Sequence, residues 1–170
     1  MTMTLDDVNQ LPAAAFLQAF GAIAEHSPWV AEAAMAVRPF ASRLAAVEAF
    51  QRAVSQASRE RQRALIAVHP DLAGKAALAG ELEPDSRSEQ AGAGLDKLTA
   101  AEMAEFQDLN GRYRARFGFP FILAVKGAGK ARILDAFRQR IDGASEEEFF
   151  TALSQVMRII RFRLEERIDG

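Results

Sequence analysis

Apolar residues recur at three- and four-residue steps along most of this chain, and that spacing constrains the fold more than any other feature. Side chains three and four residues apart lie on one face of an α-helix. Two clear runs are Leu44, Val47, Phe50 and Val54, and Phe149, Leu153, Val156 and Ile160. The alternation typical of a strand is nearly absent: only residues 119–125 could be extended, and one strand makes no sheet. The sequence therefore predicts an all-α fold.

Helix boundary signals divide the chain into segments. Thr4 can cap a short first turn, and Thr99 and Ser145 are each followed by glutamate three residues later, the pattern of a capping box. The expected helices are residues 13–25, residues 29–37, one starting at Ser42, one from Ser58 to near His69, one from Thr99 to Gly118, residues 130–140, and a last helix opening at Ser145. A loop is expected between residues 80 and 86. We find no internal repeat and expect one helical bundle domain over residues 1–170.

Charge and missing residue types exclude several functions. The formal net charge is -2, so no basic excess is available to neutralise a nucleic acid. The chain has no cysteine, which excludes disulfides, thiol nucleophiles and thiolate metal sites and fits a reducing compartment. Asp6 and Asp7 stand where a signal peptide carries positive charge, and the apolar run at residues 11–24 is too short to span a bilayer. We expect a cytoplasmic protein that binds neither nucleic acid nor membrane.

His69 is the first candidate for chemistry, and it is one of only two histidines. It ends an expected helix, where the negative end of the helix dipole favours a protonated imidazole. Pro70 restricts the backbone of the residue before it and should make the imidazole project from a rigid turn. Such a histidine suits a proton shuttle, although a structural role is the alternative. His26 is expected to be an exposed residue between helices.

A second candidate group begins at Ser86. Ser86 and Glu89 have the spacing of a capping box, which would explain both residues structurally. That pattern leaves Gln90 unexplained, and the small residues at 91–94 would let a helix or a ligand approach closely.

Arg163 is the third candidate. It lies three residues beyond Ile160 and therefore falls on the inward face of the last helix, whereas Arg161 falls well to the side. An arginine on an apolar face needs a carboxylate partner, from a ligand or from the protein. A buried salt bridge, or a stem that reaches solvent at the helix end, is the structural alternative.

The segment from Lys126 to Lys130 (KGAGK) only partly matches a phosphate-binding loop. Ala131 stands where that loop has a hydroxyl residue, and the first glycine is missing. A turn leading into the helix at residues 130–140 is the better interpretation.

Four motifs together resemble the 2-oxo-4-hydroxy-4-carboxy-5-ureidoimidazoline (OHCU) decarboxylases, enzymes of the ureide branch of purine breakdown. The motifs are HPDLAGK at residues 69–75, Ser-x-x-Glu-Gln at residues 86–90 with Ala-Gly-Leu at residues 93–95, LNGRYRARFGFPFILAVKG at residues 109–127, and RFRL at residues 161–164. They occur in order and cover nearly the whole chain.

The resemblance implies specific properties. The family is all-helical, forms a single domain that is usually homodimeric, uses neither a metal nor an organic cofactor, and converts OHCU to (S)-allantoin. The catalytic residues would be His69, Glu89 and Arg163. The substrate-binding residues would be Pro70, Ser86, Gln90, Phe119, Phe121 and Ile122, with backbone groups of residues 119–122 lining the ring pocket.

Two other functions stay open at this stage. The first is a non-catalytic helical module that holds a small ureide anion without turning it over. The second is a metal-dependent hydrolase using His69 and Glu89, but two ligands without a nearby third histidine make a poor metal site.

Overall fold

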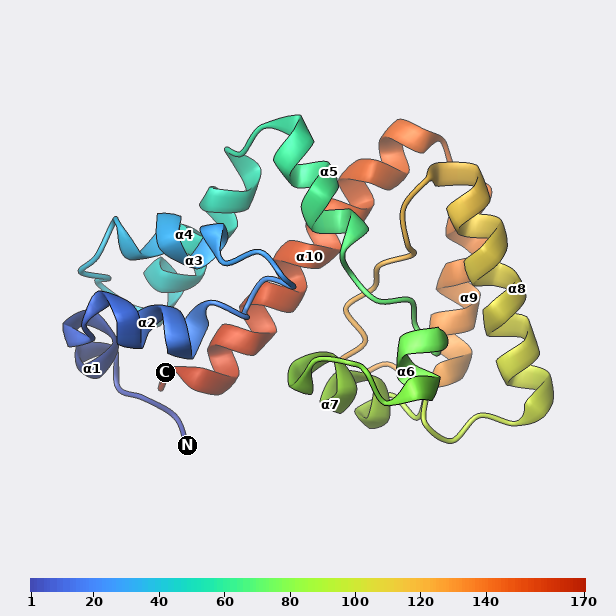
Figure 1. The fold of residues 1–170 in the computed structure, drawn as a ribbon, viewed down its shortest axis with the longest axis horizontal. Coiled ribbons are helices and arrows are strands. Elements are labelled where there is room, and N and C mark those ends of the chain that lie inside the picture. Colours follow the sequence, from blue (N-terminus) through green and yellow to red (C-terminus); the bar gives the residue numbers. More distant parts are fainter. The chain divides into compact units, whose positions relative to one another are not determined.

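A computed structural model describes residues 1–170 as ten helices without a strand (Figure 1). The helices are α1 (Leu5–Gln10), α2 (Ala13–Phe20), α3 (Trp29–Met35), α4 (Arg43–Ser55), α5 (Arg59–Ala67), α6 (Lys75–Ala79), α7 (Pro84–Gly92), α8 (Ala100–Phe117), α9 (Lys130–Arg140) and α10 (Ser145–Arg167). The predicted all-α class is confirmed. The segment at residues 119–125 is irregular and forms no strand.

The chain forms two compact units. Unit 1 comprises residues 1–68 and 156–170, and unit 2 comprises residues 69–155. By these bounds, α1 to α5 belong to unit 1 and α6 to α9 to unit 2, while α10 contributes residues to both.

Unit 1 brings the two ends of the chain side by side and packs phenylalanines in its core. Met3 N–H donates to Arg167 O at 2.8 Å, and Asp169 N–H donates to Met3 O at 2.9 Å. The rings of Phe16 and Phe20 lie 4.9 Å apart, and the Phe50 ring lies 6.3 Å from that of Phe16. All three rings are almost fully buried, so this cluster anchors α2 on α4.

The predicted caps of unit 1 are largely present. Thr4 and Asp7 form a capping box, and the hydroxyls of Ser42 and Ser58 accept from backbone N–H groups in the first turns of α4 and α5. Two details were wrong. The helix expected over residues 13–25 ends at Phe20, and a turn begins at Gly21, whose N–H donates to Leu17 O. Leu44 is 57% exposed because it lies in the first turn of α4, at the edge of the buried stripe.

Unit 2 is built around α8. The predicted capping box of Thr99 and Glu102 starts this helix, and Gly118 ends it in the left-handed conformation with φ of 77°. The ring of Tyr113 is fully buried. It lies within 6 Å of four other rings, those of Phe117, Phe119, Phe121 and Phe137. This aromatic cluster joins α8, α9 and the segment between them into one core.

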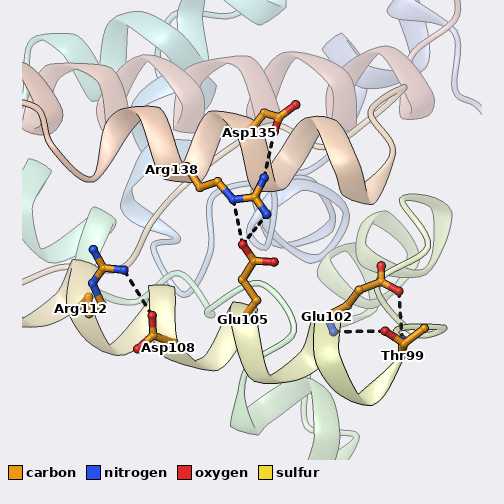
Figure 2. A network of polar contacts seen from close by, with 7 residues as sticks. All are labelled: Thr99, Glu102, Glu105, Asp108, Arg112, Asp135 and Arg138. Carbon is orange, nitrogen blue, oxygen red and sulfur yellow. Dashed lines mark hydrogen bonds and ion pairs between the residues drawn. The ribbon is translucent and has the colours of Figure 1, made fainter.

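The exposed side of unit 2 carries ion pairs. Figure 2 shows Arg138 of α9 between Glu105 of α8 and Asp135 of its own helix, and Arg112 pairing with Asp108 one turn away on α8. The hydrogen bonds that Arg138 donates to Glu105, together with the negative charge of that carboxylate, raise the pKa of Arg138, so this guanidinium stays protonated. The pair between Arg138 and Glu105 joins α8 and α9 at the surface.

Two predicted capping boxes are absent from unit 2. Ser145 is already inside α10, and Glu148 instead bonds with the side chains of Tyr113 and Arg140. Ser86 is inside α7, because Pro84, which suits the first turn of a helix, starts that helix earlier. The loop expected at residues 80–86 is therefore limited to residues 80–83, and the short helix α6 was not predicted. The glycine-lysine segment is a turn into α9, as predicted.

Candidate active site

His69 directly follows Val68, the residue that ends α5, and begins an irregular segment that leads to α6. We call residues 70–74 the histidine loop. His69 is 6% exposed, so the folded chain buries it. Pro70 is half-buried. The sequence rule placed this histidine at a helix end correctly, but its burial depends on the packing of the loop.

Three side chains from two helices hold the histidine loop. Gln90 of α7 accepts from Ala73 N–H at 3.0 Å and donates to Asp71 O at 3.3 Å. Asn110 of α8 donates through Nδ2 to Leu72 O at 2.9 Å, and Arg114 Nε lies 2.9 Å from Asp71 Oδ1. These bonds contact three consecutive loop residues and fix the path of the backbone after His69.

Ala73 shows that this path is imposed by the surroundings. Its φ is 51°, a left-handed conformation that residues with a side chain adopt infrequently. It is 1% exposed and its N–H is bonded to Gln90. Backbone of this kind persists where the surrounding structure over-determines it, and such positions concentrate at functional sites.

Asn110 is only half satisfied. Its Nδ2 bonds to Leu72, but its Oδ1 is the buried side-chain atom that finds no hydrogen-bond partner. Leaving a buried acceptor unpaired costs about 1–3 kcal/mol. A leucine of similar shape would avoid this cost, so stability of α8 alone does not explain an asparagine here.

Helix α7 carries the next predicted group. Ser86, Glu89 and Gln90 lie at positions i, i+3 and i+4 and therefore share one face of the helix. Ser86 and Gln90 are buried, and Glu89 is partly exposed. The structure brings Gln90 to the histidine loop through the two bonds above, a positioning role that the sequence did not predict. Its expected contact with substrate amides stays a prediction.

The segment at residues 119–122 is buried, its backbone included. The side chains of Phe119, Phe121 and Ile122 are each at most 3% exposed, and Phe121 stacks on Phe137 of α9 with ring centroids 3.9 Å apart. Residues 119–121 form no backbone–backbone hydrogen bond. The aromatic side chains thus belong to the core, which leaves the peptide groups as the polar atoms of this segment.

A buried polar network fixes the end of that segment. Arg140 Nη1 donates to Ile122 O at 2.7 Å, and its Nε and Nη2 lie 3.1 Å from Glu148 Oε2. The Tyr113 hydroxyl donates to the same carboxylate, and the Arg140 guanidinium lies 4.4 Å from the Phe121 ring centroid. Burial, with the hydrogen bond to the negative Glu148, raises the pKa of Tyr113 well above its usual value. The tyrosine therefore remains a neutral donor.

A cavity of about 700 Å³ lies beside the histidine loop in unit 2. Its lining comprises Pro70, Asp71, Gly74, Lys75, Ala76, Gln107, Asn110, Gly111 and Arg114. Of the predicted site residues, Pro70 alone lines this cavity. Its lining residues come from the histidine loop, the start of α6 and α8.

Arg163 belongs to unit 1, whereas the other predicted site residues belong to unit 2. It points inward, as predicted, and is 2% exposed. Its Nη1 lies 3.1 Å from Glu25 Oε2 and donates to Ile23 O at 3.1 Å. The buried salt bridge considered from sequence is therefore present. Its catalytic role stays a prediction. Arg161 is exposed and pairs with Glu165 at 2.7 Å.

Sequence reasoning missed several residues that position the site. The sequence pattern presents Glu148 as a helix cap and assigns no individual role to Asn110, Tyr113, Arg114 or Arg140. One signal was available: Asn110 follows Leu109 in the inward stripe of α8, and a polar residue there needs a partner. His26 is exposed between helices, as predicted.

The structure contains no group of three or more His, Cys, Asp or Glu side chains placed to hold a metal ion. Nor is any of its helices both long enough and apolar enough to cross a membrane.

Comparisons with known proteins converge on one family. Residues 9–165 match the family described as OHCU decarboxylase. The chain is 46% identical over 168 residues to 2-oxo-4-hydroxy-4-carboxy-5-ureidoimidazoline decarboxylase of Haloferax volcanii, covering 99% of this chain and 98% of that protein. It is 44% identical to the uric acid degradation bifunctional protein PucL of Bacillus subtilis, covering 95% of this chain and 32% of that protein.

Solved structures similar to this chain point to the same family. An (S)-allantoin synthase structure is 34% identical with a TM-score of 0.77, covering 98% of this chain and 55% of that chain. A structure of OHCU decarboxylase in the presence of (S)-allantoin has a TM-score of 0.68, covering 86% of this chain and 94% of that chain. At 19% identity, the second comparison supports the fold alone.

Proposed function

Because the chain belongs to the OHCU decarboxylase family, we propose that it is a carboxy-lyase that converts OHCU to (S)-allantoin in urate breakdown. The observation that carries this proposal is the 46% identity to a decarboxylase over 99% of the chain. The geometry of unit 2 is compatible with it, since a buried histidine is held on a loop that side chains fix on two sides.

The chemistry of the substrate defines what the protein has to do. OHCU carries a carboxylate on a ring carbon that also bears a hydroxyl, next to an imine-like carbon. When the carbon–carbon bond breaks, carbon dioxide leaves and the electron pair stays on the ring, which delocalises it. One proton then joins carbon on a single face. The protein must orient the carboxylate out of the ring plane, stabilise the developing charge and deliver that proton.

His69 and Glu89 take the proton-transfer roles in this proposal. His69 handles the hydroxyl proton and the proton that ends on carbon, and Glu89 orients the imidazole and holds its charge state. Two observations support this assignment: His69 is buried and directly precedes the histidine loop, and Glu89 directly precedes Gln90, whose side chain bonds to that loop.

The remaining predicted residues bind the substrate. Ser86 and Gln90 contact ureido and ring amides, Pro70 borders the site, and peptide groups of residues 119–122 face the ring. Arg163 grips an anionic or carbonyl oxygen with its planar fork of donors. The Glu25 carboxylate, 3.1 Å from its Nη1, would hold that fork in orientation.

The finer properties follow the family resemblance. We propose that residues 1–170 act as one functional domain, that the protein works as a homodimer in the cytoplasm, and that it uses neither metal nor organic cofactor. The absence of cysteine fits a reducing compartment.

One assay tests the activity. OHCU is generated from urate by the two upstream reactions, urate oxidation and hydrolysis of 5-hydroxyisourate, and the protein is then added. Circular dichroism should show accelerated formation of optically active allantoin. The alternative, a module that only binds ureides, predicts ligand binding without acceleration.

A His69→Asn variant tests the assignment of the shuttle. Loss of general acid–base catalysis should lower kcat by ~10²–10⁴-fold. The melting temperature should change little, because no large apolar volume is removed. A variant that keeps nearly full activity would place the proton shuttle elsewhere.

A further inference from the structure

Helix α8 contacts the histidine loop at two points one turn apart. Asn110 and Arg114 are four residues apart and therefore share a face of α8. Asn110 Nδ2 holds Leu72 O, and Arg114 Nε holds the side chain of the preceding residue, Asp71. The 18-residue helix is closed by a capping box at one end and a left-handed glycine at the other, so it offers a rigid support.

The chemistry of Asn110 indicates a role beyond packing. The residue is 6% exposed, and only one half of its amide has a partner. A group that served packing or helix stability alone would be better replaced by an apolar residue, because the unpaired Oδ1 destabilises the fold. The contact that Asn110 does make holds a backbone whose next residue, Ala73, has an unfavourable positive φ. Holding the loop is therefore its evident function.

We propose that Asn110 is a positioning residue that sets the place of the His69 imidazole through the histidine loop, with Arg114 reinforcing the same loop. This inference rests on the proposed function, in which His69 moves the proton. Leu72 is three residues from His69, and the rigid Pro70 lies between them, so a displaced Leu72 carbonyl is transmitted to the histidine. Displacing a reacting group by about 1 Å can cost about 10²-fold in rate.

Two variants and one matched control test the proposal. Asn110→Leu keeps the shape and removes both the donor and the unpaired oxygen. Asn110→Ser is smaller, cannot reach Leu72, and serves if the leucine variant fails to fold. Gln107→Leu is the control, because Gln107 is exposed, lies one turn earlier on α8 and lines the same cavity.

The readouts separate positioning from general stability. Kinetics on OHCU give kcat and KM, and thermal unfolding gives Tm. Imidazole proton NMR signals report the histidines directly, and His26→Gln assigns them because the chain has only two. His26 is exposed in unit 1 and is the internal reference.

We expect both Asn110 variants to lower kcat by ~10–100-fold with little change in KM, and to move the His69 signal but not the His26 signal. Gln107→Leu should change neither. Full kcat in the Asn110 variants would overturn the proposal, as would a loss accompanied by a lower Tm and an unmoved His69 signal. An equal loss of kcat in Gln107→Leu would also overturn the proposal, since the lining of the cavity rather than the hydrogen bond from Asn110 to Leu72 would then matter.

The design separates this proposal from the proposed function. Wild-type protein that does not accelerate allantoin formation refutes the activity, while the His69 signal in the Asn110 variants still decides whether α8 positions the imidazole. If the wild-type protein and the His69→Asn variant are equally active, His69 is not the proton shuttle, and the proposed catalytic role of Asn110 is refuted with it.

Discussion

Tyr113 allows a quantitative prediction because it is the only tyrosine in the chain and is fully buried. Its hydroxyl donates to Glu148, whose carboxylate is held by Arg140, and Arg140 holds Ile122 O at 2.7 Å. Burial, reinforced by the hydrogen bond to the anionic Glu148, raises the pKa of Tyr113 above its ordinary 10.0. The folded protein should keep this proton where the unfolded chain loses it.

The sign and size of the effect follow from proton linkage. Below about pH 10 both states hold the proton, and the stabilisation is fully present. Above that pH only the unfolded state loses it, so unfolding becomes easier by up to about 1.4 kcal/mol per pH unit. By about pH 11.5 the loss attributable to Tyr113 is about 2 kcal/mol. It continues until the pH passes the raised pKa of the folded state.

Alkaline titration checks this prediction, with one probe for the ionisation of Tyr113 and another for helix content. The ultraviolet absorbance of tyrosinate reports Tyr113 alone, and far-ultraviolet circular dichroism reports the helices. We expect tyrosinate to appear only as helical signal is lost. Tyrosinate appearing with an ordinary midpoint near pH 10, while the helices stay intact, would refute the reasoning.

Tyr113→Phe is the matched control. It should cost about 1.5 kcal/mol below pH 10, the lower end for a bond to a charged group, because Glu148 keeps both bonds from Arg140. Its stability should then fall less steeply with alkaline pH than that of the wild type. All other titratable groups are the same in both proteins, so the difference between the two curves isolates Tyr113.

Three further predictions concern the site. Glu89→Gln removes no helix cap, since α7 begins at Pro84, so Tm should hold while kcat falls by at least ~10²-fold; a fully active variant would leave Glu89 without a role in proton transfer. Arg163→Lys should lower kcat/KM by ~10–100-fold because lysine lacks the planar fork of donors, and Arg161→Lys is the control that should have no effect. Glu25→Gln, which removes the charge of the Arg163 partner, should lower Tm. An Arg163→Lys variant that changes Tm but not kcat/KM would show that the arginine is purely structural. Exhaustive EDTA treatment should leave activity unchanged, and a loss that added zinc or manganese restores would contradict the cofactor-free proposal.

Local sequence patterns were sufficient to predict features that depend on a few neighbouring residues, such as the start or end of a helix. The capping box at Thr99, the end of α8 at Gly118 and the start of α9 at Lys130 were all predicted from nearby residues. The inward direction of Arg163 followed from helical spacing alone. The candidate site residues were named by resemblance of motifs, because no local rule distinguishes a catalytic histidine from a structural one.

Tertiary structure decided which groups the buried polar side chains bond to. Arg163 meets Glu25 across 138 positions and Asn110 meets Leu72 across 38, distances in sequence that no periodicity specifies. Glu148 shows most clearly how tertiary packing can override a local capping pattern. Its spacing from Ser145 favours an exposed cap, yet the folded chain buries this carboxylate, and a buried charge requires the pairing that Arg140 and Tyr113 provide. The sequence therefore determined where most of the helices run, although it did not predict α6. Packing determined which polar groups meet, because burial makes an unpaired charge far more costly than a missing cap.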